Sequence, residues 1–141
     1  FGEYFPVPEF FRNWMRLTSL PYTDAVAGSD NQLPLEIAGE RIAITICYED
    51  VFGAEQLRFF DNASLLVNVS NDAWFGNSIA PHQHLQIARF RAAEVGRYLL
   101  RATNTGVSAI IDPRGRVVAR SPQFVPDVLK GSVRGFLGFT P

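Results

Sequence analysis

The chain contains one cysteine, Cys47, and its place in the sequence is typical of a nucleophile. It directly follows the apolar run RIAITI and precedes the polar residues Tyr48, Glu49 and Asp50. A thiol at the end of a buried strand leaves the sheet at its carboxyl edge, where nucleophiles are often placed. A cysteine after an isoleucine-rich strand is equally typical of a small buried core residue. Position alone leaves both interpretations open.

A nucleophilic Cys47 would need a base to take its proton and a cation near the developing oxyanion. The neighbouring carboxylates of Glu49 and Asp50 disfavour the thiolate. The thirteen basic residues comprise twelve arginines and one lysine, Lys130, which lies far along the chain in a different predicted element. A catalytic lysine is therefore either Lys130 or a residue outside this chain.

The two histidines offer a second hypothesis for the chemistry. His82 and His84 fall in the first turn of a predicted helix and could supply a Cys–His pair. The alternative is that both are ordinary residues of a surface helix: His82 would lie near its N-terminus, and Leu85 would cover His84. Their spacing places the two rings on different sides of a helix, which disfavours a shared metal site. Glu3 stands alone in an aromatic segment, which suits either a perturbed carboxyl group or a solvated loop carboxylate.

Hydrophobic periodicity and turn residues predict helices that alternate with strands. Helices are expected over 8–18, 52–60 and 78–97, and strands over LPLEIAG, GERIAITICYED, LLVNVS, YLLRATNTG, VSAII and VVARS. Both faces of RIAITI look largely buried, so we expect it in the middle of a sheet that is covered on at least one side. Asp112, Pro113 and Gly115 fit a type I turn between the last two strands. The pattern indicates an α/β fold with a mixed sheet.

Two of the predicted helices have distinct apolar faces. In the long helix, the inward stripe is expected to comprise Leu85, Ala88, Ala92 and Val95. The first helix, in FFRNWMRL, presents aromatic side chains opposite arginines. We expect it to pack on the sheet, and the alternative is a surface helix that touches lipid while its arginines meet headgroups.

Length and composition set limits on the class of protein. The chain has 141 residues, of which 47% are hydrophobic and 13% aromatic, with a net charge of −1. These values exclude a disordered tail, and the chain lacks the excess of basic residues that is typical of a nucleic-acid binder. No apolar run reaches the ~20 residues that span a bilayer, and no signal peptide opens the chain. The chain begins at Phe1 without an initiator Met, so we expect a globular domain or a piece of one.

Three motifs point to a known family. ITICYED, NVSNDAWFG and RATNTGVSAIIDPRGRV, in this order, resemble the carbon–nitrogen hydrolase (nitrilase) superfamily. FGEYFP, CYED and SNDAWFG resemble its lipoprotein N-acyltransferase branch, and the likeness covers essentially the whole chain. The resemblance implies a four-layer α-β-β-α sandwich, of which residues 1–141 would be the C-terminal part. It also implies a Glu–Lys–Cys triad in which the cysteine attacks.

The resemblance assigns roles to four residues of this chain. Cys47 matches the nucleophile, Glu3 a further glutamate that the branch requires, and Tyr48 and Glu49 the positions after the cysteine, with the Tyr48 backbone N–H in the oxyanion hole. The general-base Glu and the triad Lys would lie upstream of Phe1, so the chain alone is expected to be inactive. Alone, it should also expose the apolar faces of RIAITI and LLVNVS.

The implied reaction moves a fatty acyl chain from a phospholipid, through a Cys47 thioester, to the α-amino group of a diacylglyceryl-cysteine lipoprotein. The expected surroundings are the bacterial inner membrane, with the domain facing the periplasm, and neither a cofactor nor a metal nor nucleic acid is expected. The alternatives are a soluble nitrilase-type amidase that uses Cys47, and a non-catalytic module in which Cys47 belongs to the core. The aromatic side chains of FFRNWMRL and DAWFG favour a lipid substrate.

Overall fold

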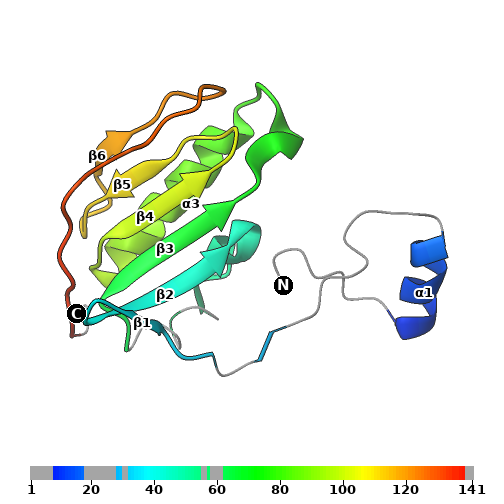
Figure 1. Ribbon diagram of the computed structural model, residues 1–141, viewed down its shortest axis with the longest axis horizontal. Helices are drawn as coiled ribbons and strands as arrows, with labels where there is room; N and C mark the ends of the chain where they lie inside the picture. Colours follow the sequence, from blue (N-terminus) through cyan, green and yellow to red (C-terminus); the bar gives the residue numbers. More distant parts are fainter. Residues whose placement is uncertain (1–7, 18–27, 30–31, 55–56, 58–61, 139–141) are drawn as a thin grey trace.

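A single mixed sheet with a long helix on one face forms the body of the molecule (Figure 1). The computed structural model describes residues 8–17, 28–29, 32–54, 57 and 62–138. The six strands lie in the sheet in chain order: β1 (Leu35–Ile37), β2 (Glu40–Ile46), β3 (Leu65–Ser70), β4 (Leu99–Thr103), β5 (Ala109–Ile111) and β6 (Val117–Arg120). β2, β3 and β4 are parallel, and the outer pairings are antiparallel. The predicted α/β class with a mixed sheet is confirmed.

Tight turns join the strands of both antiparallel hairpins. Between β1 and β2, Ala38 and Gly39 adopt positive φ angles of 53° and 83°, as two-residue hairpin loops require. Between β5 and β6, the Gly115 N–H donates to the Asp112 carbonyl at 2.9 Å. The Asp112 carboxylate accepts from the N–H groups of Arg114 and Arg116 at 2.9 and 2.8 Å. This second turn confirms the one predicted from Asp112 to Gly115.

Helix α3 (Ala80–Val95) connects β3 to β4 and packs on the sheet. Its buried side chains include the predicted stripe of Leu85, Ala88, Ala92 and Val95, which belongs to one core with residues of the sheet such as Leu66, Leu99 and Ile111. Small alanine side chains let the helix approach the strands closely. The helix ends at Gly96, whose φ of 62° lies in the left-handed region. The predicted long helix and its inward face are therefore confirmed.

The other face of the sheet is partly uncovered at β2 and β3. Ile44, Ile46 and Val69 are 41%, 49% and 39% exposed. The C-terminal segment 121–138 runs beside β5 and β6 and stacks Phe136 on Tyr98, with ring centroids 6.1 Å apart (Figure 1). The expectation that both faces of β2 are buried is wrong for this chain, because nothing in its described part covers these side chains. The expected exposure of RIAITI and LLVNVS is confirmed.

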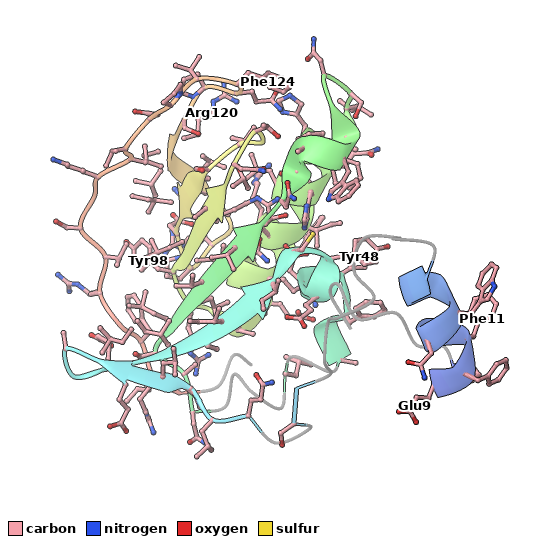
Figure 2. The ribbon with its side chains drawn as sticks, turned by 45° about the vertical axis from the view of Figure 1, so that its right-hand side comes forward. Glu9, Phe11, Tyr48, Tyr98, Arg120 and Phe124 are labelled. Atoms are coloured by element: carbon pink, nitrogen blue, oxygen red, sulfur yellow. The ribbon has the colours of Figure 1, made fainter. Side chains whose placement is uncertain are left out.

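Helix α1 (Glu9–Leu17) stands apart from the sheet (Figures 1 and 2). Phe10 and Trp14 are 75% and 54% exposed, and Phe11 contacts Trp14 with ring centroids 5.3 Å apart. The expectation that this helix packs on the sheet is wrong, because its aromatic side chains contact one another and solvent instead. Of the helix predicted over 52–60, only residues 53, 54 and 57 are described with helical backbone. Among the described helices, none has the length and apolar character needed to cross a membrane.

Candidate active site

Cys47 lies at a sharp bend between β2 and the 3-10 helix η1 (Cys47–Val51). Its φ angle is 52°, in the left-handed region that costs a residue with a side chain about 1–2 kcal/mol. The thiol residue is half-buried, and the following Tyr48 is exposed at the carboxyl edge of the sheet (Figure 2). The predicted strand-to-helix position is confirmed, and the surrounding structure must stabilise the unfavourable backbone.

Side chains from three elements hold this bend. The Cys47 carbonyl oxygen accepts a hydrogen bond from Nδ2 of Asn68, on β3, at 3.2 Å. Nε2 of His84, on α3, lies 3.2 Å from the same oxygen. The Glu49 carboxylate turns back and accepts from the Ile46 N–H at 2.7 Å. The backbone on both sides of Cys47 is therefore fixed by hydrogen bonds.

Beneath the bend lies a buried cluster of charged side chains, called here the charge network: Asp50, Asp72, His84 and Arg101. His84 lies between the two carboxylates, with Nε2 3.0 Å from Asp50 Oδ1 and Nδ1 3.2 Å from Asp72 Oδ1. Arg101 reaches the same pair, at 3.5 Å from Asp50 Oδ2 and 3.1 Å from Asp72 Oδ2. It also donates to the Asn68 amide oxygen, which turns the amide nitrogen towards Cys47. Two carboxylates thus meet two basic side chains.

The loops after β3 and β4 together place Asp72, the first residue of η2 (Asp72–Phe75). The Ser70 hydroxyl donates to its carboxylate at 2.6 Å, and its backbone N–H donates to Asn104 Oδ1 at 3.0 Å. A Cβ atom at Gly106 would collide with the Asp72 carboxylate, so this loop needs a glycine. Residues of the SND and RATNTG runs of the sequence therefore together fix the position of Asp72.

The charge network changes the protonation of His84 and Asp72. Burial alone would lower the pKa of the His84 imidazole, but its hydrogen bonds to Asp50 and Asp72 raise that pKa to about 9. Burial alone would raise the pKa of Asp72, but hydrogen bonds from His84 and Ser70, with the charge of Arg101, lower it to about 2. At neutral pH His84 is a cation whose two N–H groups both donate. Both ring nitrogens are engaged, with Asp72 on one side and with Asp50 and the Cys47 carbonyl on the other, so the geometry gives no support to the Cys–His hypothesis.

This arrangement predicts a loss of stability in alkaline solution. The pKa of His84 is raised from 6.5 to about 9, so its stabilising contribution is complete below pH 6.5 and is lost as the pH rises through 9. At about 1.4 kcal/mol per pKa unit, the free energy of unfolding should fall by up to about 3 kcal/mol. Urea denaturation of the wild type and of His84→Gln at pH 6 and pH 9.5 measures it. An equal fall in both proteins would contradict the assignment.

The other candidate residues lie elsewhere. Glu3 lies outside the described residues. Lys130 is exposed in the C-terminal segment, next to Gly131, which approaches Ile110 on β5, so β3 and β4 separate it from the strand of Cys47. His82 is exposed on α3, away from the buried His84. Within the described part of the chain, no group of three or more His, Cys, Asp or Glu side chains is arranged to hold a metal ion.

Exposed apolar side chains lie on the elements that supply the charge network. They come from η1 and the residue after it, and from η2 and the start of α3: Tyr48 (52% exposed), Phe52 (39%), Trp74 (58%), Phe75 (39%) and Ile79 (67%). Tyr48 and Phe52 contact edge to face, with ring centroids 5.8 Å apart. We call these five side chains the apolar rim. The helices that carry the two buried carboxylates of the charge network thus also carry, or lie next to, exposed apolar side chains.

Sequence reasoning did not identify Asn68, Asp72 or Arg101 as members of this site, and it treated Asp50 only as a neighbouring charge. A signal was nevertheless present in two strands. Asn68 lies two residues after Leu66 on β3, and Arg101 lies two residues after Leu99 on β4, so each polar residue shares the buried face of the leucine. A polar residue at a core-facing position of an apolar strand needs a buried partner.

The fold and this strand-end cysteine define a class of protein. The model of the carbon–nitrogen hydrolase family matches residues 7–135, and the chain belongs to that family. It is similar over all of its 141 residues to proteins named apolipoprotein N-acyltransferase: 53% identical to that of Nitrosomonas europaea, 48% to that of Azotobacter vinelandii and 43% to that of Neisseria meningitidis. The chain spans only 27–28% of the length of these relatives.

Two solved structures have a similar fold. A carbon–nitrogen hydrolase from Helicobacter pylori superposes with a TM-score of 0.63 over 72% of this chain and 43% of that one, at 13% identity. The NitFhit protein of Caenorhabditis elegans superposes with a TM-score of 0.60 over 74% of this chain and 27% of that one, at 24% identity. The carbon–nitrogen hydrolase fold inferred from the motifs is confirmed; the described chain contributes one helical layer and one sheet to it.

Proposed function

We propose that this chain is the nucleophile-bearing part of a lipoprotein N-acyltransferase that faces the bacterial periplasm. The carrying observation is Cys47 in its strained bend at the carboxyl edge of the sheet, with the carbonyl held from behind. The relatives that match over the whole chain bear the name of this enzyme. Strain that is maintained by a dedicated set of buried hydrogen bonds is typical of a functional residue.

The proposed reaction has two steps. The Cys47 thiolate attacks the ester carbonyl of a phospholipid, the ester C–O bond breaks, and the lysophospholipid alcohol leaves with a proton. The α-amino group of a diacylglyceryl-cysteine lipoprotein then attacks the thioester, loses a proton and releases the thiolate. The general-base Glu, the triad Lys and Glu3 complete this proposal, the first two from sequence upstream of Phe1. The Tyr48 backbone N–H stabilises the oxyanion of each step.

The apolar rim supports a lipid substrate over a small polar amide. Large side chains such as Trp74, Phe75 and Ile79 stay in contact with water, at a cost that contact with acyl chains would remove. Helix α1 also exposes Phe10 and Trp14 and would lie in the membrane interface. Both surfaces suit an enzyme that takes its acyl donor from a bilayer.

The proposal is tested with the full-length protein that carries this chain. Phospholipid vesicles with a labelled acyl chain should yield a hydroxylamine-sensitive adduct of one acyl mass on Cys47, located by peptide mass spectrometry. Addition of a synthetic diacylglyceryl-cysteine peptide should discharge the label onto the peptide α-amine. Hydrolysis of small amides through Cys47, without an acyl adduct from phospholipid, would instead support the amidase alternative.

Glu49 offers a specific test of positioning near the nucleophile. Glu49→Ala removes the acceptor of the Ile46 N–H and should slow thioester formation ~100-fold, because the bend would lose one of its restraints. Glu49→Gln keeps a carbonyl oxygen in the same place and should retain most of the rate. Single-turnover measurement of the labelled thioester distinguishes them. Equal rates for wild type and Glu49→Ala would reduce Glu49 to a solvated side chain.

A further inference from the structure

We propose that His84 is a positioning residue for acyl transfer: as an imidazolium clamped by Asp50 and Asp72, it orients the peptide group between Cys47 and Tyr48. This inference rests on the proposed function. His84 does not touch the thiol, so it takes no direct part in attack or proton transfer. Its role would be to keep the Tyr48 N–H directed at the oxyanion.

The first step of the argument is the geometry of one peptide group. A trans peptide is planar, so the Cys47 carbonyl and the Tyr48 N–H point in opposite directions. Asn68 and His84 draw the carbonyl oxygen into the buried charge network, at 3.2 Å each. The Tyr48 N–H must then point away from the network, on the side where Tyr48 is exposed. It lies in the first turn of η1, where the helix itself has no acceptor for it.

The second step is the requirement for a charged ring. A neutral imidazole carries one N–H, so one of its nitrogens would face an acceptor with a lone pair. If Nε2 lost its proton, the link from His84 to the Cys47 carbonyl and Asp50 would break. If Nδ1 lost it, the nitrogen would face the Asp72 carboxylate. Only the imidazolium can donate to Asp50 of η1 and to Asp72 of η2 at the same time. These two hydrogen bonds fix the positions of both helices relative to the bend.

The third step is the set of groups that face His84. They are Asp50 of η1, Asp72 of η2 and, through both carboxylates, Arg101 of β4. From β3 the neutral amide of Asn68 shares the Cys47 carbonyl with it. Two carboxylates and two cations balance, so the ring keeps its charge while buried. Deprotonation leaves a net negative network directly behind the nucleophile, which both loosens the bend and opposes the developing oxyanion.

The experiment compares wild type, His84→Gln and the matched control His82→Gln in the full-length protein. Thioester formation on Cys47 from labelled phospholipid vesicles is measured in single turnovers from pH 6 to pH 10. At pH 7 we expect His84→Gln to be ~100-fold slower than wild type, as misplacement of a reacting group commonly is, and His82→Gln to match wild type. Above pH 9 the ratio of wild-type to His84→Gln rates should fall with each further pH unit, because a decreasing share of the wild type then holds an imidazolium.

Two further readouts separate positioning from damage to the fold. Alkylation of Cys47 by iodoacetamide needs no oxyanion donor, so its rate in His84→Gln should stay close to that of wild type, whereas unfolding would raise it. Nitrogen-15 NMR of wild type should show both ring nitrogens of His84 protonated at pH 7.5, a test that needs no variant. A neutral His84 at that pH, or a rate ratio that is one at pH 7 or constant with pH, would overturn the inference. Absence of any wild-type thioester would overturn the proposed function itself, and with it this inference.

Discussion

Cys47→Ser is expected to abolish acyl transfer in the full-length protein. Serine fills nearly the same volume and can occupy the same bend, so the fold should survive. Its hydroxyl lacks thiolate character and would be a far poorer nucleophile in a site arranged for a thiol. Labelled acyl chains from phospholipid vesicles should therefore leave no adduct at position 47, and a diacylglyceryl-cysteine peptide should remain unacylated.

The controls for this prediction address stability and specificity. Circular dichroism and urea denaturation of Cys47→Ser should match wild type, since the buried core and the charge network are untouched. Cys47→Ala should be equally inactive. A Cys47→Ser protein that keeps near-normal turnover would remove Cys47 from the mechanism and leave it as a core residue.

Arg101→Met should destabilise the protein by about 3–5 kcal/mol, the usual cost of removing one partner from a buried ion pair. The Arg101 side chain is fully buried and serves Asp50, Asp72 and Asn68. Without it, two carboxylates share one cation, His84, in a site closed to water. The midpoint of urea denaturation at pH 7 measures the loss.

A matched surface substitution serves as the control for this prediction, and a double variant tests whether the lost stability comes from unbalanced charge. Arg120→Met, at an exposed position of β6, should change the free energy of unfolding by no more than about 0.5 kcal/mol. Combining Arg101→Met with Asp50→Asn removes one charge of each sign and should recover part of the lost stability. If Arg101→Met costs no more than Arg120→Met, the charge network does not stabilise the folded chain.

Apolar periodicity predicted the framework well because the framework is built from local rules. The spacing of Leu85, Ala88, Ala92 and Val95 specifies one face of a helix, and that face is buried. The run LLVNVS is a strand over those same six residues. The turn from Asp112 to Gly115 follows from residues that favour its backbone angles. Each of these features depends on neighbours in the chain, so one sequence suffices to find it.

Contacts between distant parts of the chain were harder to predict. The pattern in α1 shows which face is apolar, but it cannot say whether a sheet or a lipid surface meets that face. Asp50, Asp72 and Arg101 come from separate elements, and only the parallel pairing of β2, β3 and β4 brings them to one edge. His84 could be placed on a helix but not between two carboxylates. Its hydrogen bonds to both carboxylates, and therefore its raised pKa, follow from that tertiary arrangement alone.

The chain order of the strands has a consequence for how the site forms during folding. Each strand pairs with the strand that precedes it in the sequence, so the sheet can grow by successive additions to one edge as the polypeptide emerges. Asp50, Asp72 and His84 are in place once α3 has docked, but Arg101 arrives only with β4. Until then the two acids have a single counterion. The bend at Cys47 should therefore be among the last parts of the chain to become rigid, and an unfinished intermediate would hold its thiol loosely.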